Sequence, residues 1–131
     1  TSREIEELVS FLPRLYAEGF TPIKQWHGGI PDKDGVIQFP WPEYDETVIE
    51  FMTASGRECW TDPEYVAQNV GQMLSTDPAA IEIADLARIQ TILTWCVRVE
   101  RFCEGHWGDV IESGLVSQLL QRLAEIGTSS D

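Results

Sequence analysis

The chain has 131 residues, 43% of them hydrophobic, which is enough for one domain with a buried core and too short for two. It carries 22 acidic and 9 basic residues, a net charge of −13. Binding to nucleic acid or to anionic lipid requires clustered positive charge, so this composition argues against both kinds of partner. No apolar run approaches the roughly 20 residues that cross a bilayer, and the start TSREIEELVSFL lacks the features of a secretory signal, so we expect a cytoplasmic protein.

The first predicted element is a helix at the start of the sequence. Thr1 and Glu4 have the spacing of a capping box, and apolar residues then recur at helical intervals from Ile5 to Tyr16. Gly19 suits the left-handed residue that often ends a helix. We therefore expect one amphipathic helix before Gly19.

An extended insert follows, between residues 20 and 42. It is rich in Pro and Gly, residues 32–35 (DKDG) are typical of a turn, and residues 36–39 (VIQF) have strand character. We predict a short two-stranded β-hairpin near residues 22–40, in which residues 23–26 pair with residues 36–39.

The remainder of the chain predicts helices, most of them opened by Asp or Pro and ended near glycine. The expected elements are a helix from Pro42 to Gly56, a second from Asp62 to Leu74, a short turn at Asp77–Pro78, a central helix from Asp85 to Gly105 and a last helix from about Leu115 to Ile126. The predicted fold class is therefore mainly α (α+β), a single domain of four to six helices with a short β-hairpin. We expect this domain to span residues 1–127 and residues 128–131 to form a frayed C-terminal tail.

The cysteines indicate a reduced protein without a metal centre. Their number, three, is odd, and the spacings of Cys59, Cys96 and Cys103 match no disulfide framework. A zinc site that joins them to His27 and His106 is the alternative, but the chain has no CxxC pair. We expect no metal and no cofactor, and we expect Cys96 and Cys103 to be buried, because their seven-residue spacing places both on the apolar face of the central helix.

Charged and aromatic side chains crowd into the segment RVERFCEGHW, residues 98–107. Arg98 and Arg101 lie three residues apart on one helix face, so two guanidiniums could clamp a carboxylate or a phosphate. His106 could titrate near neutral pH beside them. The interpretation we favour is structural: both arginines pair with acidic residues and fasten helices together. A small-anion or peptide site is the second interpretation, and catalysis is the third.

A second candidate is the loop that begins at Trp26 and His27, next to the flexible pair Gly28-Gly29. It suits either a ligand-facing loop or a Trp anchor in the core. The chain has no phosphate-binding glycine motif and no GxSxG elbow. The candidate ligand or partner residues are Arg98, Arg101, His106, Trp107, Trp95, Trp26 and His27, and we predict no catalytic residue.

The stretch from Ile92 to Leu123 resembles the C-terminal part of a small prokaryotic family known as domain of unknown function 6508. The resemblance rests on a VRxxRFCEGH pattern, a following glycine at Gly114 and a leucine-rich helix with arginine. Residues 40–44 and the ECWTDPEY turn are also similar, whereas the N-terminal third matches weakly and Trp107 stands where an aliphatic residue is commoner. The resemblance covers about two-thirds of the chain and implies a single domain, but no activity, because the family has none assigned.

These observations favour a non-catalytic, intracellular interaction or regulatory protein with an acidic surface. Its partner is expected to be a protein, and a basic one suits the charge; nucleic acid and membranes are not expected partners. The alternative is a small-anion or peptide-binding protein, or an enzyme, that uses Arg98, Arg101 and His106. The sequence does not predict an oligomeric state.

Overall fold

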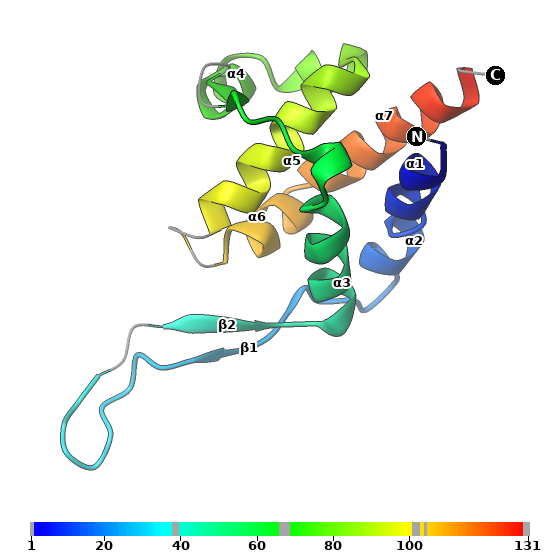
Figure 1. Ribbon diagram of the computed structural model, residues 1–131. Helices are drawn as coiled ribbons and strands as arrows, with labels where there is room; N and C mark the ends of the chain where they lie inside the picture. Colours follow the sequence, from blue (N-terminus) through cyan, green and yellow to red (C-terminus); the bar gives the residue numbers. More distant parts are fainter. Residues whose placement is uncertain (1, 38–39, 66–68, 101–102, 104, 130–131) are drawn as a thin grey trace.

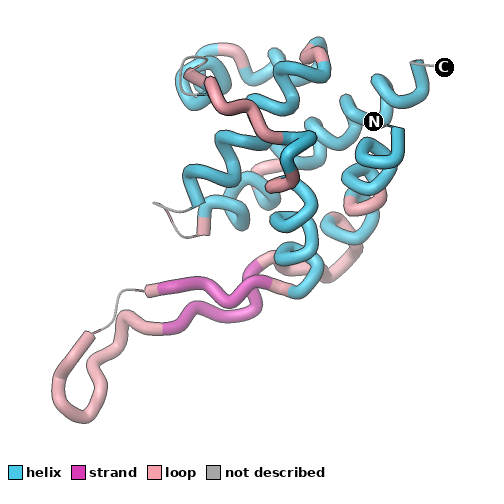
Figure 2. The backbone as a smooth tube through the Cα atoms, viewed as in Figure 1, coloured by secondary structure: helices cyan, strands magenta, loops and turns pink. Residues whose placement is uncertain are grey.

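The computed structural model describes residues 2–37, 40–65, 69–100, 103 and 105–129. These residues form a helical body from which one antiparallel β-hairpin projects (Figures 1 and 2). The mainly α (α+β) prediction is confirmed, because helices dominate and the described strands form a single two-stranded sheet. None of the helices in this part of the chain is long and apolar enough to cross a membrane.

The helices enclose one continuous core. Helix α5 contributes Ile89, Ile92, Leu93 and Cys96, and the C-terminal helix packs Leu119, Leu120 and Leu123 against them. The N-terminal helix lies along the C-terminal one, so the two ends of the chain lie close together (Figure 1). The α-helices are α1 Ser2–Val9, α2 Leu12–Leu15, α3 Glu46–Ser55, α4 Val70–Thr76, α5 Leu86–Glu100, α6 His106–Glu112 and α7 Leu115–Ser129, and the 3-10 helices are η1 Glu58–Trp60 and η3 Pro78–Ile83.

The start of the chain forms two helices, α1 and α2, and not the single helix predicted before Gly19. Pro13 lies in the first turn of α2. A proline has no amide hydrogen, and its ring clashes with the carbonyl four residues earlier, so one continuous helix cannot run through this position. The chain therefore breaks after Val9 and restarts at Leu12.

The hairpin pairs β1 (Ile23–His27) with β2 (Trp41–Tyr44), and the predicted pairing with residues 36–39 is wrong. Asp32 closes a local turn: its carboxylate accepts the amides of Asp34 (2.8 Å) and Val36 (2.9 Å), and its own amide donates to the Val36 carbonyl. Because the backbone of Val36 is hydrogen-bonded within this turn, the return strand begins at Trp41 and not at Val36. Residues 38 and 39 lie outside the described part of the chain.

Helix α3 begins at Glu46, and Pro42 lies in β2 rather than in a first helical turn. Asp45 determines this start, because its carboxylate accepts the Thr47 amide at 2.9 Å, which is an N-cap. The helix predicted from Asp62 is not continuous: residues 66–68 lie outside the described part of the chain, and α4 starts at Val70. The preceding Asn69 has a left-handed φ of 49°, a conformation that a continuing helix does not contain.

The central and last helices agree best with the prediction. Asp85 caps α5 by accepting the Arg88 amide at 2.8 Å, and α7 continues past Ile126 to Ser129. Cys96 is buried as predicted, but Cys103 is exposed. Its amide donates to the Val99 carbonyl at 2.8 Å, so the predicted burial of the apolar helix face does not extend as far as Cys103. The predicted turn at Asp77–Pro78 opens the 3-10 helix η3.

Candidate functional site

Glu100, the last residue of α5, connects three elements of the structure. Its Oε1 accepts hydrogen bonds from the Tyr44 hydroxyl (2.8 Å) and the Trp107 amide (2.8 Å). Its Oε2 accepts the Gly105 amide at 3.1 Å. The first amides of a helix have no partner inside the helix, and a carboxylate suits them in both geometry and charge. One side chain therefore joins α5 to the start of α6 and to the end of β2.

Tyr44 acts as a neutral donor in this arrangement. Burial and the adjacent Glu100 carboxylate both raise the pKa of its hydroxyl well above its ordinary value. The phenol therefore keeps its proton at physiological pH and donates it to Glu100. The sequence interpretation searched for acidic partners of arginines and missed this role, although a glutamate shortly before a glycine-initiated helix is a recognisable signal.

The hairpin rests directly on the backbone of α6. Gly105 has φ +96°, and a Cβ there would lie 2.8 Å from Cη2 of Trp26. A Cβ on Gly108 would lie 2.8 Å from Cδ1 of Ile23. Glycine at these two positions allows the strand to approach this closely. We call Ile23, Trp26, Tyr44, Glu100, Gly105, Trp107 and Gly108 the joint.

Two predicted site residues of α6 serve the interior. Trp107 is 1% exposed, and its ring meets Phe51 edge-on at 5.3 Å. His106 meets Trp95 edge-on at 4.7 Å, and its buried Nε2 has no hydrogen-bond partner among the described residues. Burial lowers the pKa of His106, although the Glu100 and Asp109 carboxylates oppose this shift. The ring therefore remains neutral at physiological pH.

The two predicted arginines have different outcomes. Arg101 lies outside the described residues, as does Phe102, so the proposed clasp through Arg101 stays a prediction. Arg98 places its guanidinium 5.9 Å from the centre of the Tyr65 ring and forms no ion pair with any described residue. It lines a small cavity together with residues of α3.

His27 is held within the hairpin. Its Nε2 lies 2.8 Å from Oε1 of Glu43, and its ring stacks on Trp41 at 4.2 Å. Trp26, the neighbour of His27, packs against Gly105 and so contacts the VRVERFCEGHW segment (residues 97–107), as a shared site would require. It places His27 on the hairpin, where its partners are Glu43 and Trp41.

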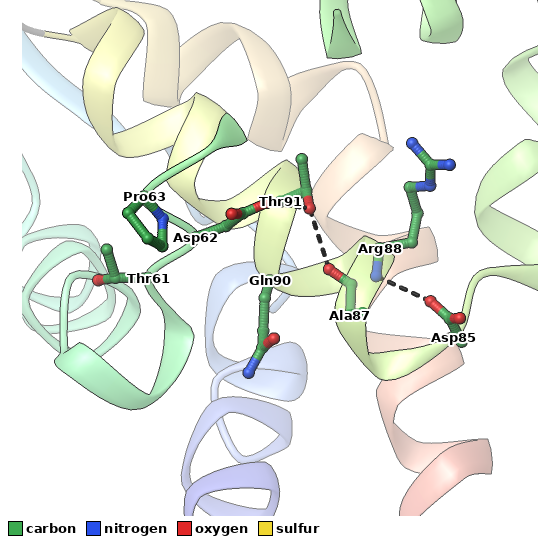
Figure 3. A pocket seen from close by; sticks show the side chains of 8 residues that line it. All are labelled: Thr61, Asp62, Pro63, Asp85, Ala87, Arg88, Gln90 and Thr91. Carbon is green, nitrogen blue, oxygen red and sulfur yellow. Dashed lines mark hydrogen bonds between the residues drawn. The ribbon is translucent and has the colours of Figure 1, made fainter. Parts of the chain in front are cut away.

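A cavity of about 390 Å³ lies between residues 61–63 and the start of α5 (Figure 3). Its acidic groups serve the fold. Asp62 accepts the Thr91 hydroxyl at 2.6 Å and the Glu64 amide at 2.9 Å, and these bonds lower the pKa of its carboxyl group. Asp85 is occupied as the cap of α5. No group of three or more His, Cys, Asp or Glu side chains in the described ranges could hold a metal ion.

The outer part of the hairpin differs from the joint. We call residues 28–37 together with Trp41 the distal arm. Every described residue of this arm is exposed. Its large apolar side chains are 43–79% exposed, and a cavity of about 380 Å³ runs along it from Gln25 to Val36. The exposed apolar residues of the arm are Ile30, Val36, Ile37 and Trp41.

Comparison with known proteins identifies a family. The family of unknown function DUF6508 matches residues 1–129, which includes the N-terminal third where the sequence interpretation found only a weak resemblance. No curated protein matches the chain. No solved structure matches it either.

Proposed function

Since the chain belongs to the family of unknown function DUF6508, which supplies no activity, we propose a function from the structure. The protein is a non-catalytic interaction protein that binds a basic partner protein through its distal arm. The observation that carries this proposal is the concentration of exposed apolar side chains on that arm, whose backbone extends away from the helices (Figure 2). We place the protein in the cytoplasm, because its described cysteines, Cys59, Cys96 and Cys103, are all free thiols.

The arm offers more contact energy than an ordinary loop. Burial of one large apolar side chain stabilises by about 1.5–3 kcal/mol, and the distal arm presents four of the eight exposed large hydrophobics among the described residues. The exposed apolar residues of the helical body are Tyr16, after α2, Ile49 in α3 and Ile83 in η3. Scattered apolar residues are normal on a surface, whereas a contiguous group marks a contact site.

The charge distribution supports a basic partner. Both lysines of the chain, Lys24 and Lys33, lie on the hairpin beside Asp32, Asp34 and Glu43, so the hairpin is nearly neutral. Most of the net charge of −13 therefore belongs to the helical body. We expect the body to attract a basic protein over a long range and the arm to supply the apolar contact.

The joint supports a non-catalytic function. Its polar groups are occupied by one another: Glu100 accepts from Tyr44 and from the α6 amides, and Trp107 is buried in the core. A general acid or base needs reach to a substrate. At the joint, the Glu100 carboxylate and the Tyr44 hydroxyl are hydrogen-bonded to each other and to the backbone.

The test is photo-crosslinking in the source cell. A photoreactive amino acid replaces Ile37 on the distal arm or, as a matched control, Ile83 on the body; the two side chains are 61% and 81% exposed. We expect a discrete adduct with one positively charged protein from position 37 and none from position 83. Equal labelling at both positions, or no adduct at 37, contradicts the proposal. An adduct of twice the mass of the chain would show that the arm binds a second copy and would also contradict it.

A further inference from the structure

A small cavity lies between the end of α3 and the second half of α5. Its volume is about 70 Å³. One water needs roughly 10–15 Å³ of such volume, so the space suits a group of a few heavy atoms. The lining residues are Ser55, Gly56, Thr61, Thr94, Val97 and Arg98.

Ser55 contributes an unused hydroxyl to this cavity. Its side chain is 1% exposed, and its Oγ has no hydrogen-bond partner among the described residues. Buried hydroxyls in proteins nearly always have a partner. Thr94, on the opposite wall, is different: it donates to the Gln90 carbonyl (2.9 Å) and accepts the Asp62 amide (2.8 Å). Ser55 is therefore the hydroxyl that remains free to bind a ligand.

Arg98 contributes an unpaired positive charge. Three other described arginines, Arg14, Arg57 and Arg122, each have a glutamate within ion-pair distance. Arg98 has none among the described residues, although the chain holds 22 acidic side chains. Its ring contact with Tyr65 leaves the hydrogens of the guanidinium available. Guanidinium groups bind carboxylates and phosphates through paired hydrogen bonds.

We propose that this cavity binds a small oxyanion, a carboxylate or a phosphate group, between the guanidinium of Arg98 and the hydroxyl of Ser55. The site is separate from the distal arm and does not depend on the function proposed for it. The strongly negative molecule repels anions elsewhere, so binding at this cavity requires the local positive charge of Arg98.

The experiment is an NMR titration of the full chain with sodium acetate and, separately, with sodium phosphate, each compared with sodium chloride at equal ionic strength. The side-chain Nε–H signals of Arg98 and Arg14 are followed. We expect a saturable shift at Arg98 with at least one of the two anions and none at Arg14, which is paired with Glu50. The anion that shifts the signal at the lower concentration identifies the chemical class.

Variants test the assigned contacts. Arg98→Ala should weaken binding about 10- to 100-fold, and Ser55→Ala about tenfold or less, because a charge-assisted hydrogen bond is worth more than a neutral one. Ser55→Ala removes an unpaired buried hydroxyl and should fold, and Arg14→Ala is the matched control that leaves affinity unchanged. No shift beyond that given by chloride, which would indicate water only, overturns the proposal. An equal loss with Arg98→Ala and Arg14→Ala overturns it as well.

Discussion

The two halves of one β-hairpin have different environments. At the joint, Ile23 and Trp26 contact the backbone of α6, although Trp26 is 49% exposed, and the buried Tyr44 donates to the Glu100 carboxylate. On the distal arm, Ile30 and Ile37 are 79% and 61% exposed. A hairpin that served only the fold would not need the exposed half. The joint therefore explains how the arm is held, and the arm presents the surface that is available for function.

The contacts of the VRVERFCEGHW segment are structural, but by another route than the arginine ion pairs that the sequence favours. The contacts of Glu100, Gly105 and Trp107 are internal hydrogen bonds and core packing. Density of charged and aromatic residues marks a place where the fold needs several specific contacts. Such density does not by itself indicate a ligand.

Removal of the Glu100 carboxylate should have the largest effect. Glu100→Ala leaves the Tyr44 hydroxyl and the Gly105 and Trp107 amides without an acceptor, so we expect a loss of roughly 3–5 kcal/mol in the free energy of unfolding. Urea denaturation measures it. Glu100→Gln keeps an acceptor oxygen and should lose about half as much. A change below about 0.5 kcal/mol in Glu100→Ala would show that the joint does not hold the hairpin.

Two glycine substitutions separate backbone strain from the contact with Trp26. Gly105 and Gly114 both have positive φ, +96° and +89°, but only Gly105 has a neighbour within 4 Å of the position of a Cβ. Each Gly→Ala change should cost about 1–2 kcal/mol from the backbone. Gly105→Ala should cost about 1–3 kcal/mol more from the collision with Trp26. Equal melting temperatures for the two variants would mean that Trp26 does not press on Gly105.

His106, next to the joint, should make the stability of the protein sensitive to acid. Burial lowers its pKa in the folded state, so the unfolded chain takes up the proton first as pH falls. The contribution of the neutral ring to stability is complete above the ordinary pKa, about 6.5, and decreases as pH falls below it. His106→Phe keeps the edge contact with Trp95 and should flatten the fall of the melting temperature between about pH 7.5 and about pH 5.5. Parallel curves for the two proteins would contradict this assignment.

Substitution on the distal arm should have the smallest effect on stability. Ile37→Ser removes an exposed side chain and should change the free energy of unfolding by less than about 0.5 kcal/mol. We also expect this variant to bind its partner more weakly. With the photoreactive amino acid at position 30 in place of Ile30, Ile37→Ser should therefore abolish the cross-linked adduct. A marked loss of stability would show that the arm packs on the body and is not free to bind.

The helices were predictable where local pattern decides the structure. The apolar periodicity of α5 and α7 and the cap at Asp85 predicted those elements well. The strand β2 was not predictable in the same way, because Pro42 argues against a strand and the pairing depends on how Asp32 closes its turn. Exposure of Cys103 depends on how far other elements cover the apolar helix face beyond Cys96, which periodicity does not determine.

The candidate site was predictable only in part. The sequence identified Trp26 and the C-terminal segment, and the structure brings them together through Gly105. It did not identify Glu100 as the centre of the joint, because the local signal of a glutamate before a glycine-initiated helix does not include the bond to Tyr44, which depends on the packing of the hairpin. Pairing of Ser55 with Arg98 around a cavity arises only when α3 packs against α5.

Amide hydrogen exchange followed by NMR compares the two halves of the hairpin in one measurement. If Glu100 holds the joint, the Gly105 and Trp107 amides exchange only when the structure opens and are strongly protected, whereas the Ile30 and Lys33 amides of the distal arm exchange at nearly the rate of an unfolded chain. In Glu100→Gln the protection at Gly105 and Trp107 should fall while exchange on the arm stays the same. Exchange at Trp107 as fast as at Lys33 in the native protein would contradict the assignment of this segment to the joint.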